Sequence, residues 1–334
     1  MILVTGGTGM LGAYLLHSLS KKKHQVIATY RRIESLQKVK ELFDILTPQY
    51  PEYFESIIWK QASINDVDAL GRAFEGVKYV YHCAAKVSLA EFHFDKLAKS
   101  NVEGTANVVN AAIKNKVKKF AYVSSIAAIS AETQVKTIDE THSWNHSKDH
   151  TGYAHSKYGA ELEVWRASQE GLDVVIVNPG VILGSFFWKR SSGMLIQRIA
   201  NGLNFYPTGA VSVVGLSDVI KVLIQLMESS IKNERFILVS DNLSQKELTQ
   251  KIARHLSKKP PVYPLSKGLL GFLFIIEKTI SLFGLRKNFI SIPLIESLCN
   301  TQKYEGSKIT EYLDFQYSKL DDVLKKIGQD YKTI

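Results

Sequence analysis

Short apolar runs alternate with longer helix-like segments through the first half of this 334-residue chain. Each run is rich in Val, Ile and Tyr and has the length of a buried strand, whereas the segments between the runs carry apolar residues at helical spacing. The predicted strands are 2–5, 24–30, 56–60, 78–85, 119–125 and 172–180, and the predicted helices are 10–22, 34–46, 66–75, 91–115 and 151–170. Strands that alternate with helices of this length predict a doubly wound α/β fold, in which helices cover both faces of a parallel sheet.

The pattern changes near residue 185. Helical periodicity dominates the second half, and the predicted elements there are helices at 190–202, 216–229, 244–256, 266–284 and 319–328 and one strand at 235–240. We therefore expect a first domain over residues 1–185 and a smaller, mainly helical lobe over residues 186–334, some segments of which return to the first domain. Open α/β sheets bind ligands at the carboxyl ends of their strands, so the second lobe is expected to fold against that edge and to bind the substrate.

The composition restricts the class of protein. With 45% hydrophobic and 22% charged residues, the chain is typical of an ordinary folded domain. Residues 1–6 already read as a buried strand entering a turn, which leaves no room for a signal peptide. Cys83 and Cys299 are far apart and lack the partner spacing of a disulfide framework or a zinc site. We expect a cytoplasmic protein that holds no metal.

The net charge of +10 comes from Lys and Arg residues that are scattered in short groups. Groups of this kind are usually solvated helix ends or turns. The charge therefore predicts a general attraction for anionic ligands and gives no reason to expect a nucleic-acid partner.

The most apolar stretch of the sequence is residues 269–285. Glu277 and Lys278 interrupt it well short of the ~20 apolar residues that a membrane-spanning helix needs. Three roles stay open for it: packing on the core, covering a hydrophobic substrate pocket, or peripheral contact with a membrane surface. The side chains that suit a pocket are Phe272, Phe274, Ile275 and Leu282.

A glycine-rich turn, TGGTGMLG at residues 5–12, directly follows the first predicted strand and opens the first predicted helix. In this position Gly6 allows a tight turn, Gly9 lets the backbone approach a pyrophosphate, and Gly12 permits close packing of helix on strand. The helix N-terminus would then face the phosphates. The turn predicts a dinucleotide site that includes Gly6, Thr8, Gly9, Met10, Leu11 and Gly12.

The end of the second strand bears on which dinucleotide binds. A cofactor with a free ribose 2′-hydroxyl usually meets an Asp or Glu there, but the sequence reads ATYRR. Arg31 and Arg32 suit a 2′-phosphate, because guanidinium groups bind phosphate oxygens in pairs of hydrogen bonds. We therefore expect NADP(H) in preference to NAD(H); the alternative is a solvated basic strand end.

Tyr153 and Lys157 are one helical turn apart, so a helix would place both side chains on one face. The spacing alone does not single them out, because the same pattern occurs at Tyr263/Lys267 and Tyr304/Lys308. The position in the chain singles them out, because only Tyr153 opens a predicted helix between two predicted strands of the parallel sheet. We expect the catalytic pair at Tyr153 and Lys157.

Several stretches together resemble the extended short-chain dehydrogenase/reductase family, in order as well as in residues. They are TGGTGMLG (5–12), YHCAA (81–85), NVEGTANVV (101–109), YVSSIAA (122–128), YAHSK (153–157) and NPGVILG (178–184). The last is most similar to the branch of dihydroflavonol reductases and 3β-hydroxysteroid dehydrogenases. The resemblance implies a Rossmann-type sheet over the first 185 residues or so and is faint beyond them.

The resemblance also assigns roles. It implies that Tyr153 is the proton donor and acceptor, Lys157 its partner, and Ser125 the hydroxyl that contacts the substrate oxygen. Further positions expected beside the cofactor are Ala84, Ala85, Asn101, Pro179, Gly180 and Val181, and Tyr153 and Lys157 are expected to contact it as well, Lys157 at the nicotinamide ribose. Ser63 and Ile64 stand where the family commonly has an Asp that meets the adenine. Ser63 offers a weaker hydrogen bond, so we expect looser recognition of the adenine.

The chemistry follows from these residue types. A phenol transfers protons best when its pKa falls from about 10 toward neutrality, and we expect Lys157 to lower the pKa of Tyr153. Ile126 and Ala127 occupy the positions where sugar-nucleotide dehydratases of this fold carry an Asp-Glu pair, which disfavours dehydration. The predicted protein is an NADP(H)-dependent oxidoreductase for a small hydrophobic ketone, aldehyde or alcohol, as a monomer or homodimer. The alternatives are a sugar-nucleotide epimerase and a non-catalytic NADP(H)-binding sensor or assembly factor.

Overall fold

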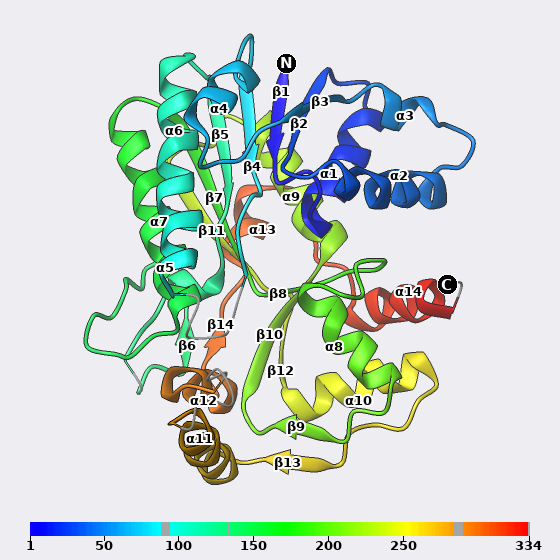
Figure 1. The fold of residues 1–334 in the computed structure, drawn as a ribbon, viewed down its shortest axis with the longest axis vertical. Coiled ribbons are helices and arrows are strands. Elements are labelled where there is room, and N and C mark those ends of the chain that lie inside the picture. The colour runs from blue at the N-terminus through cyan, green and yellow to red at the C-terminus, as the bar shows by residue number, and fades with distance from the viewer. Residues whose placement is uncertain (88–93, 133, 283–289, 333–334) are drawn as a thin grey trace.

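A computed structural model describes residues 1–87, 94–132, 134–282 and 290–332. Its central sheet has seven strands, all parallel, in the order β11-β7-β5-β4-β1-β2-β3 (Figure 1). The strands are β1 (Ile2–Thr5), β2 (Val26–Tyr30), β3 (Ile58–Gln61), β4 (Tyr79–His82), β5 (Lys119–Val123), β7 (Asp173–Pro179) and β11 (Glu234–Leu238). The predicted doubly wound α/β fold is confirmed.

Helices cover both faces of this sheet. One apolar cluster joins the sheet to α1 (Met10–Lys21), α2 (Glu34–Leu46) and α9 (Leu216–Glu228). A second cluster joins the opposite face to α4 (Val67–Ala73), α6 (Gly104–Lys114) and α7 (Gly152–Gln169). The short helix α3 (Glu52–Glu55) connects α2 to β3.

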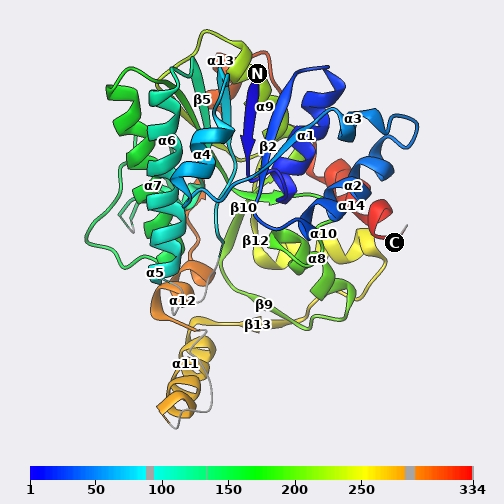
Figure 2. The same ribbon diagram turned by 45° about the horizontal axis from the view of Figure 1, so that its top comes forward.

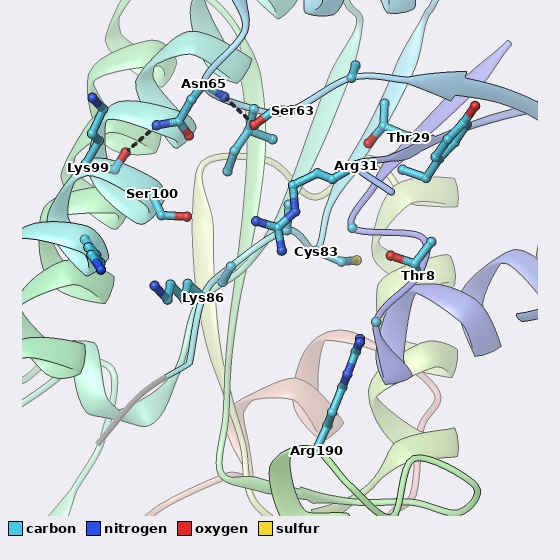
Figure 3. A pocket seen from close by; sticks show the side chains of 18 residues that line it. Thr8, Thr29, Arg31, Ser63, Asn65, Cys83, Lys86, Lys99, Ser100 and Arg190 are labelled. Carbon is cyan, nitrogen blue, oxygen red and sulfur yellow. Dashed lines mark hydrogen bonds between the residues drawn. The ribbon is translucent and has the colours of Figure 1, made fainter. Parts of the chain in front are cut away.

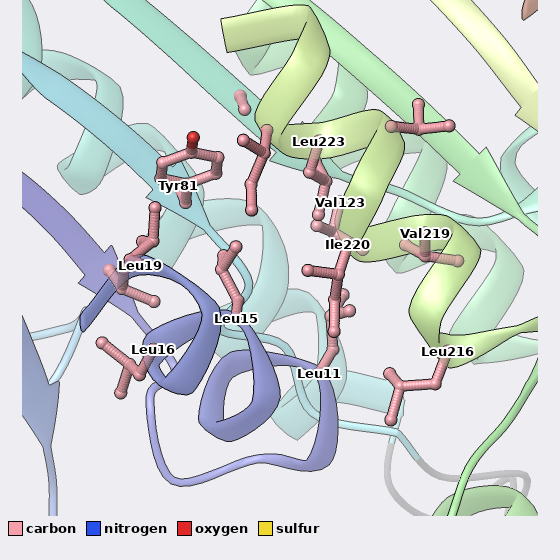
Figure 4. Close-up of a cluster of buried hydrophobic side chains, with 14 of the residues drawn as sticks. Leu11, Leu15, Leu16, Leu19, Tyr81, Val123, Leu216, Val219, Ile220 and Leu223 are labelled. Atoms are coloured by element: carbon pink, nitrogen blue, oxygen red, sulfur yellow. The ribbon is translucent and has the colours of Figure 1, made fainter. Parts of the chain in front are cut away.

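Helix α9 comes from the second half of the chain but completes the core of the first. Figure 4 shows its apolar side chains facing those of α1 across Tyr81 and Val123 of the sheet. The side chains that meet there include Leu11, Leu15 and Leu19 of α1 and Leu216, Ile220 and Leu223 of α9. With β11, which pairs with β7, this helix ties the second half of the sequence to the central sheet.

The helix predicted at 91–115 is described from residue 94 onward, and residues 91–93 lie outside the described part of the chain. It consists of α5 (Phe94–Leu97), a π-helical turn η2 (Ala98–Glu103) and α6 in direct succession. A π-helical turn inside a helix often accompanies a functional site.

The second lobe is less helical than predicted. It contains a three-stranded sheet in the order β12-β10-β8, which α8 (Ser191–Ala200), α10 (Gln245–Leu256) and α14 (Leu320–Lys332) cover. The strands of this sheet are β8 (Val181–Leu183), β10 (Ala210–Gly215) and β12 (Asp241–Ser244). These strands were not predicted. β8 has only three residues and β12 reads DNLS, so neither shows an alternation of apolar and polar residues, whereas β10 reads AVSVVG and is strand-like in composition.

Two small pairs of strands complete the lobe: β9 (Phe205–Pro207) with β13 (Tyr263–Leu265), and β6 (Thr137–Ile138) with β14 (Lys303–Tyr304). The remaining helices are η3 (Ile126–Ala128), α11 (Lys267–Leu282), α12 (Ile292–Cys299) and α13 (Lys308–Tyr312). Residues 283–285 of the apolar stretch, and the end of the helix predicted at 266–284, lie outside the described residues.

Phe272 and Ile275 of α11 are exposed, so they do not pack in the core, and neither lines the cavities at the candidate site. Phe274 is partly buried, and the side chain of Leu282 is not among those described. Figure 2 shows α11 standing away from the body of the protein. Within the described ranges, every helix is too short or too polar to cross a membrane.

Candidate active site

The glycine turn leaves β1 and enters α1 at the point where the strand order of the sheet reverses. β1 lies between β4 on one side and β2 on the other, so the loops that leave β1 and β4 diverge and open a crevice. Gly9 is the residue that precedes α1, and its N–H donates to the carbonyl of Gly6 at 3.0 Å. The free N–H groups of the first turn of α1 can then face an anion.

Two of the glycines are required by sterics. Gly6 has φ +73°, and a Cβ on it would lie 2.6 Å from the backbone nitrogen of Ala84. A Cβ on Gly12 would lie 2.3 Å from the carbonyl oxygen of Gly6. The turn is therefore closed by backbone contacts that only glycine permits at these two positions.

A cavity of about 390 Å³ lies at the crevice (Figure 3). Eight residues predicted to bind the cofactor line it: Gly6, Thr8, Gly9, Arg31, Ser63, Ile64, Ala84 and Ala85. Met10, Leu11 and Gly12 are buried at the start of α1, behind the turn. The cavity thus brings together the predicted residues from the ends of β1, β2, β3 and β4.

The charge of the cavity is strongly positive. Its lining includes the cationic side chains of Arg31, Lys86, Lys96, Lys99 and Arg190. None of the described residues that line it is acidic. A basic cleft of this kind attracts anions and suits the phosphates of a dinucleotide.

Arg32 lines a neighbouring cavity, together with Glu34, Ser35, Lys38 and Arg190. Three cations there face one carboxylate. Burial and the neighbouring Arg190 guanidinium both lower the pKa of Lys38, which shows how closely the cations gather. This concentration of positive charge lies next to the end of β2.

Ser63 accepts a hydrogen bond from the backbone N–H of Asn65 at 3.3 Å. Asn65 lines the cavity as well, and its side-chain amide donates to the carbonyl of Lys99 at 3.1 Å (Figure 3). Asn65 was not among the residues predicted to bind the cofactor. A side-chain amide at this position is a second polar group on the side expected for the adenine.

Asn101 is buried beside the cavity and does not line it. Its side chain bonds both backbone groups of Lys86, accepting at 2.7 Å and donating at 2.9 Å, and also donates to the Ser156 hydroxyl at 2.9 Å. These bonds fix the loop after β4 against α7. Contact of Asn101 with a cofactor stays a prediction.

Ser125 and Tyr153 come together from two different elements. Ser125 follows β5, and its hydroxyl accepts from the N–H of Ala127 at 3.2 Å. Thr151 caps α7 by accepting from the N–H of Ala154, which places Tyr153 in the first turn of that helix. The Tyr153 phenol lies near enough to the Ser125 hydroxyl for Ser125 to lower the pKa of Tyr153.

The pKa of Tyr153 differs from our expectation. Burial raises it, and the Ser125 hydroxyl opposes that rise without cancelling it. The expected lowering by Lys157 is not seen in this structure, because the Lys157 ammonium donates to other groups. Its partners are the Val123 carbonyl at 2.7 Å and the Tyr122 hydroxyl at 3.2 Å.

Lys157 is itself buried at the carboxyl end of β5. Burial lowers its pKa to about 8, and the nearby carboxylate of Glu161 acts in the opposite direction. A lysine whose pKa lies near neutrality is typical of a functional site.

Pro179 ends β7, and Gly180 and Val181 lead into β8. Asn178, one residue earlier, donates to the Ser125 carbonyl at 3.0 Å. The segment predicted to pass the nicotinamide is thereby tied to the strand end that carries Ser125. Contact of Pro179, Gly180 and Val181 with a cofactor stays a prediction.

The other two Tyr/Lys pairs each lie on two different elements. Tyr304 is on β14 and its hydroxyl donates to the Ile129 carbonyl at 3.4 Å, while Lys308 pairs with Glu234 at 2.6 Å. Tyr263 is exposed on β13, and Lys267 begins α11. Neither pair lies on one helix, so only Tyr153 and Lys157 share a helix.

Comparison with known proteins identifies the family. The sequence model of the NAD dependent epimerase/dehydratase family matches residues 2–236. The chain belongs to this family. The predicted resemblance to extended short-chain dehydrogenases/reductases is therefore confirmed, and a nicotinamide cofactor is supported. As members of the family act on carbon–oxygen groups, this epimerase/dehydratase family protein is an NAD(P)-dependent enzyme of that kind.

Two curated relatives of this family protein are reductases by name. The "Putative dihydroflavonol 4-reductase" of Synechocystis sp. is 27% identical over 328 residues, which cover 96% of this chain and 91% of the relative. Tetraketide alpha-pyrone reductase 2 of Arabidopsis thaliana is 28% identical over 277 residues, which cover 78% of this chain and 83% of the relative. The crystal structure of gox2253 has a TM-score of 0.83 at 24% identity and covers 100% of this chain and 98% of its own, which shows the shared fold.

Arg190 is the residue of this site that sequence reasoning could least have found. It stands just before α8 in the second lobe, and Figure 3 shows its side chain pointing into the cavity toward the glycine turn. No local motif surrounds it. In the sequence, only the overall excess of Lys and Arg indicated that a cation such as Arg190 could reach an anion site.

Proposed function

We propose that this protein is an NADP(H)-dependent oxidoreductase that reduces a small hydrophobic ketone or aldehyde, or oxidises the matching alcohol. The observation that carries the proposal is the meeting of Tyr153 and Ser125 at the carboxyl edge of the sheet, with Lys157 one turn away. Residues 1–185 would form the cofactor domain and residues 186–334 the substrate lobe. The protein would act as a monomer or homodimer in the cytoplasm, where its free cysteines stay reduced.

The cofactor would lie across the glycine turn, with its phosphates at the start of α1 and beside the cations of the cavity. Gly6 and Gly12 leave the close backbone approach that this needs. When bound, the nicotinamide supplies or accepts the hydride. Arg31 and Arg32, with Lys38 and Arg190, favour NADP(H), because a 2′-phosphate adds negative charge beside them.

The side chains of the protein supply the proton transfer. Tyr153 donates its phenolic proton to the carbonyl oxygen as the alcohol forms and takes it back in the reverse reaction. The Ser125 hydroxyl holds the same oxygen by a hydrogen bond. In this structure Lys157 donates to Val123 and Tyr122, so its proposed role, to favour the phenolate form of Tyr153 by its charge, requires the ammonium to turn toward the phenol.

The choice of a hydrophobic substrate is supported by the names of the relatives, which include reductases of flavonoid and pyrone compounds. The loop after Ser125 offers Ile126 and Ala127 where a dehydratase would need acids. A non-catalytic sensor is the weaker alternative, because this chain keeps both Tyr153 and Lys157 on α7.

The test is turnover. Purified protein would be incubated with NADPH and a panel of apolar ketones and aldehydes, and the loss of NADPH absorbance followed. We expect oxidation of NADPH with at least one apolar carbonyl compound. Inactivity with the whole panel, together with interconversion of nucleotide sugars, would show that the sugar-nucleotide epimerase is the correct alternative.

A further inference from the structure

Helix α11 presents apolar side chains to the outside of the molecule. The side chains concerned are between 36% and 62% exposed: Leu269, Phe272, Leu273, Ile275, Ile276 and Ile280. Among the described side chains of this helix, only Leu270 is buried. Such a run of exposed apolar residues marks an interaction site rather than ordinary surface.

The exposed residues share one side of the helix. Leu269, Ile276 and Ile280 recur at helical spacing on the outer side. Leu270 and Phe274 lie on the opposite side, on which α11 packs against α12. A helix on the surface of a globular protein normally turns its apolar side inward. Here the outer side is apolar too, so it requires an apolar partner.

The apolar surface continues beyond the helix. Val262 and Tyr263 just before α11 are exposed, and the Tyr263 ring lies 5.6 Å from that of the exposed Phe205. Ile292 at the start of α12 is exposed as well. Figures 1 and 2 both show α11, α12, β9 and β13 at one end of the molecule. We call these four elements the apolar end.

Lysines lie on the apolar end and in the segment that leads into it: Lys267 and Lys278 are on α11, and Lys258 and Lys259 precede β13. Lys258, Lys259, Lys267 and Lys278 are all exposed. Two acids of this region are engaged: Glu296 lies 3.7 Å from Lys267, and Glu277 accepts the backbone N–H of Ile290 at 2.7 Å. A long lysine side chain can keep its ammonium at the level of lipid headgroups while apolar neighbours go deeper. A second copy of this chain would bring the same lysines to the contact, so an anionic surface is the better electrostatic match.

We propose that the apolar end inserts into the surface of a bilayer that contains anionic phospholipids. The helix α11 has 16 residues and lies in the interface without crossing it. Apolar side chains enter the boundary between headgroups and acyl chains, and the lysines bind the anionic headgroups. The protein is thus a peripheral membrane protein whose substrate lobe faces the lipid.

The test is flotation of the purified full chain with vesicles of phosphatidylcholine alone or mixed with phosphatidylglycerol. We expect binding to the mixed vesicles that weakens as salt is added. The double variant Phe272→Ser/Ile275→Ser should bind about a hundredfold more weakly, since each side chain no longer leaves water. The double variant Lys258→Gln/Lys259→Gln should bind the mixed vesicles about tenfold or more weakly than the parent, with no change on phosphatidylcholine alone.

A matched control is Val67→Ser/Leu162→Ser, which removes two exposed apolar side chains from α4 and α7, away from the apolar end. It should bind like the parent. Far-UV circular dichroism checks that every variant is folded, as expected for exposed positions. Any one of three results overturns the proposal. They are no binding to vesicles, equal binding to both kinds of vesicle, and a dimer in sedimentation velocity that the double variant Phe272→Ser/Ile275→Ser dissociates.

Discussion

Ser124 donates a 2.7 Å hydrogen bond from its hydroxyl to the buried carboxylate of Glu161. Asn178 donates to the same oxygen at 2.8 Å, and Arg235 lies 3.3 Å from the other oxygen. Glu161 therefore joins the ends of β5 and β7 and the strand β11 to the middle of α7. Because Ser125 follows Ser124 and Lys157 lies one turn before Glu161, this carboxylate positions both sides of the candidate site.

Glu161→Gln should shift the pH dependence of turnover. The negative charge of Glu161 opposes the lowering of the pKa of Lys157, which stands at about 8, so its removal lowers that pKa further. If the ammonium form is the active one, turnover of the parent falls as the pH rises through about 8. Turnover of the variant then falls at a lower pH. The measurement is kcat/KM against pH for both proteins.

The same change should reduce the free energy of unfolding by about 3 kcal/mol, because Arg235 loses its buried partner. Glu163→Gln is the matched control, since Glu163 lies on the same helix and pairs with Arg166 at 2.9 Å on the surface. It should leave both the pH profile and the stability nearly unchanged. Equal shifts in the two variants would mean that Glu161 has no special role.

Tyr153→Phe should lower turnover by about 10²- to 10⁴-fold, because the proton donor is lost. Affinity for the cofactor should change little, since the phenol is not among the residues that line the cavity. Tyr158→Phe is the control: Tyr158 is on the same helix, and its ring stacks on Trp144 at 4.5 Å. Steady-state kinetics and cofactor titration separate the two effects, and a fully active Tyr153→Phe protein would refute the assigned role.

Arg31→Ala should weaken binding of NADPH by about 10- to 100-fold, because a charged hydrogen bond to phosphate is lost. Binding of NADH should change far less. Lys40→Ala provides a control on the adjacent helix, where Lys40 pairs with Asp44 at the surface at 2.9 Å. Fluorescence titration with both cofactors measures the difference. Equal affinity of the parent protein for NADPH and NADH would contradict the preference.

Gly6→Ala and Gly171→Ala should differ, although both glycines have positive φ, +73° and +93°. A Cβ on Gly171 meets nothing within 4 Å, so the cost is the backbone strain of about 1–2 kcal/mol. A Cβ on Gly6 collides with the backbone of Ala84, which must move and distort the cavity. Urea denaturation should show a larger loss for Gly6→Ala, and only that variant should lose cofactor binding. Similar losses of stability and binding in both would argue against the steric explanation.

Local patterns sufficed for the central sheet and the glycine turn. All seven of its strands, β11 included, were predicted as strands, because most are runs rich in apolar, β-branched or aromatic residues. The helices between the first six strands were predicted from apolar residues at helical spacing. The turn could be read as well, since a strand, three spaced glycines and a helix are contiguous in the chain. Ser125, Tyr153 and Lys157 could be predicted because their motifs follow the glycine turn in the order that the family shows.

Tertiary structure decided the rest. The small sheet of the second lobe pairs β8, β10 and β12, which are far apart in sequence, and β8 and β12 are too short or too polar to show a local period. Arg190 reaches the cavity only because its lobe folds against the crevice, and Glu161 matters only because β5, β7 and β11 converge on it. The outward apolar side of α11 could not be predicted either: composition shows that a segment is apolar, but what it packs against depends on the whole chain.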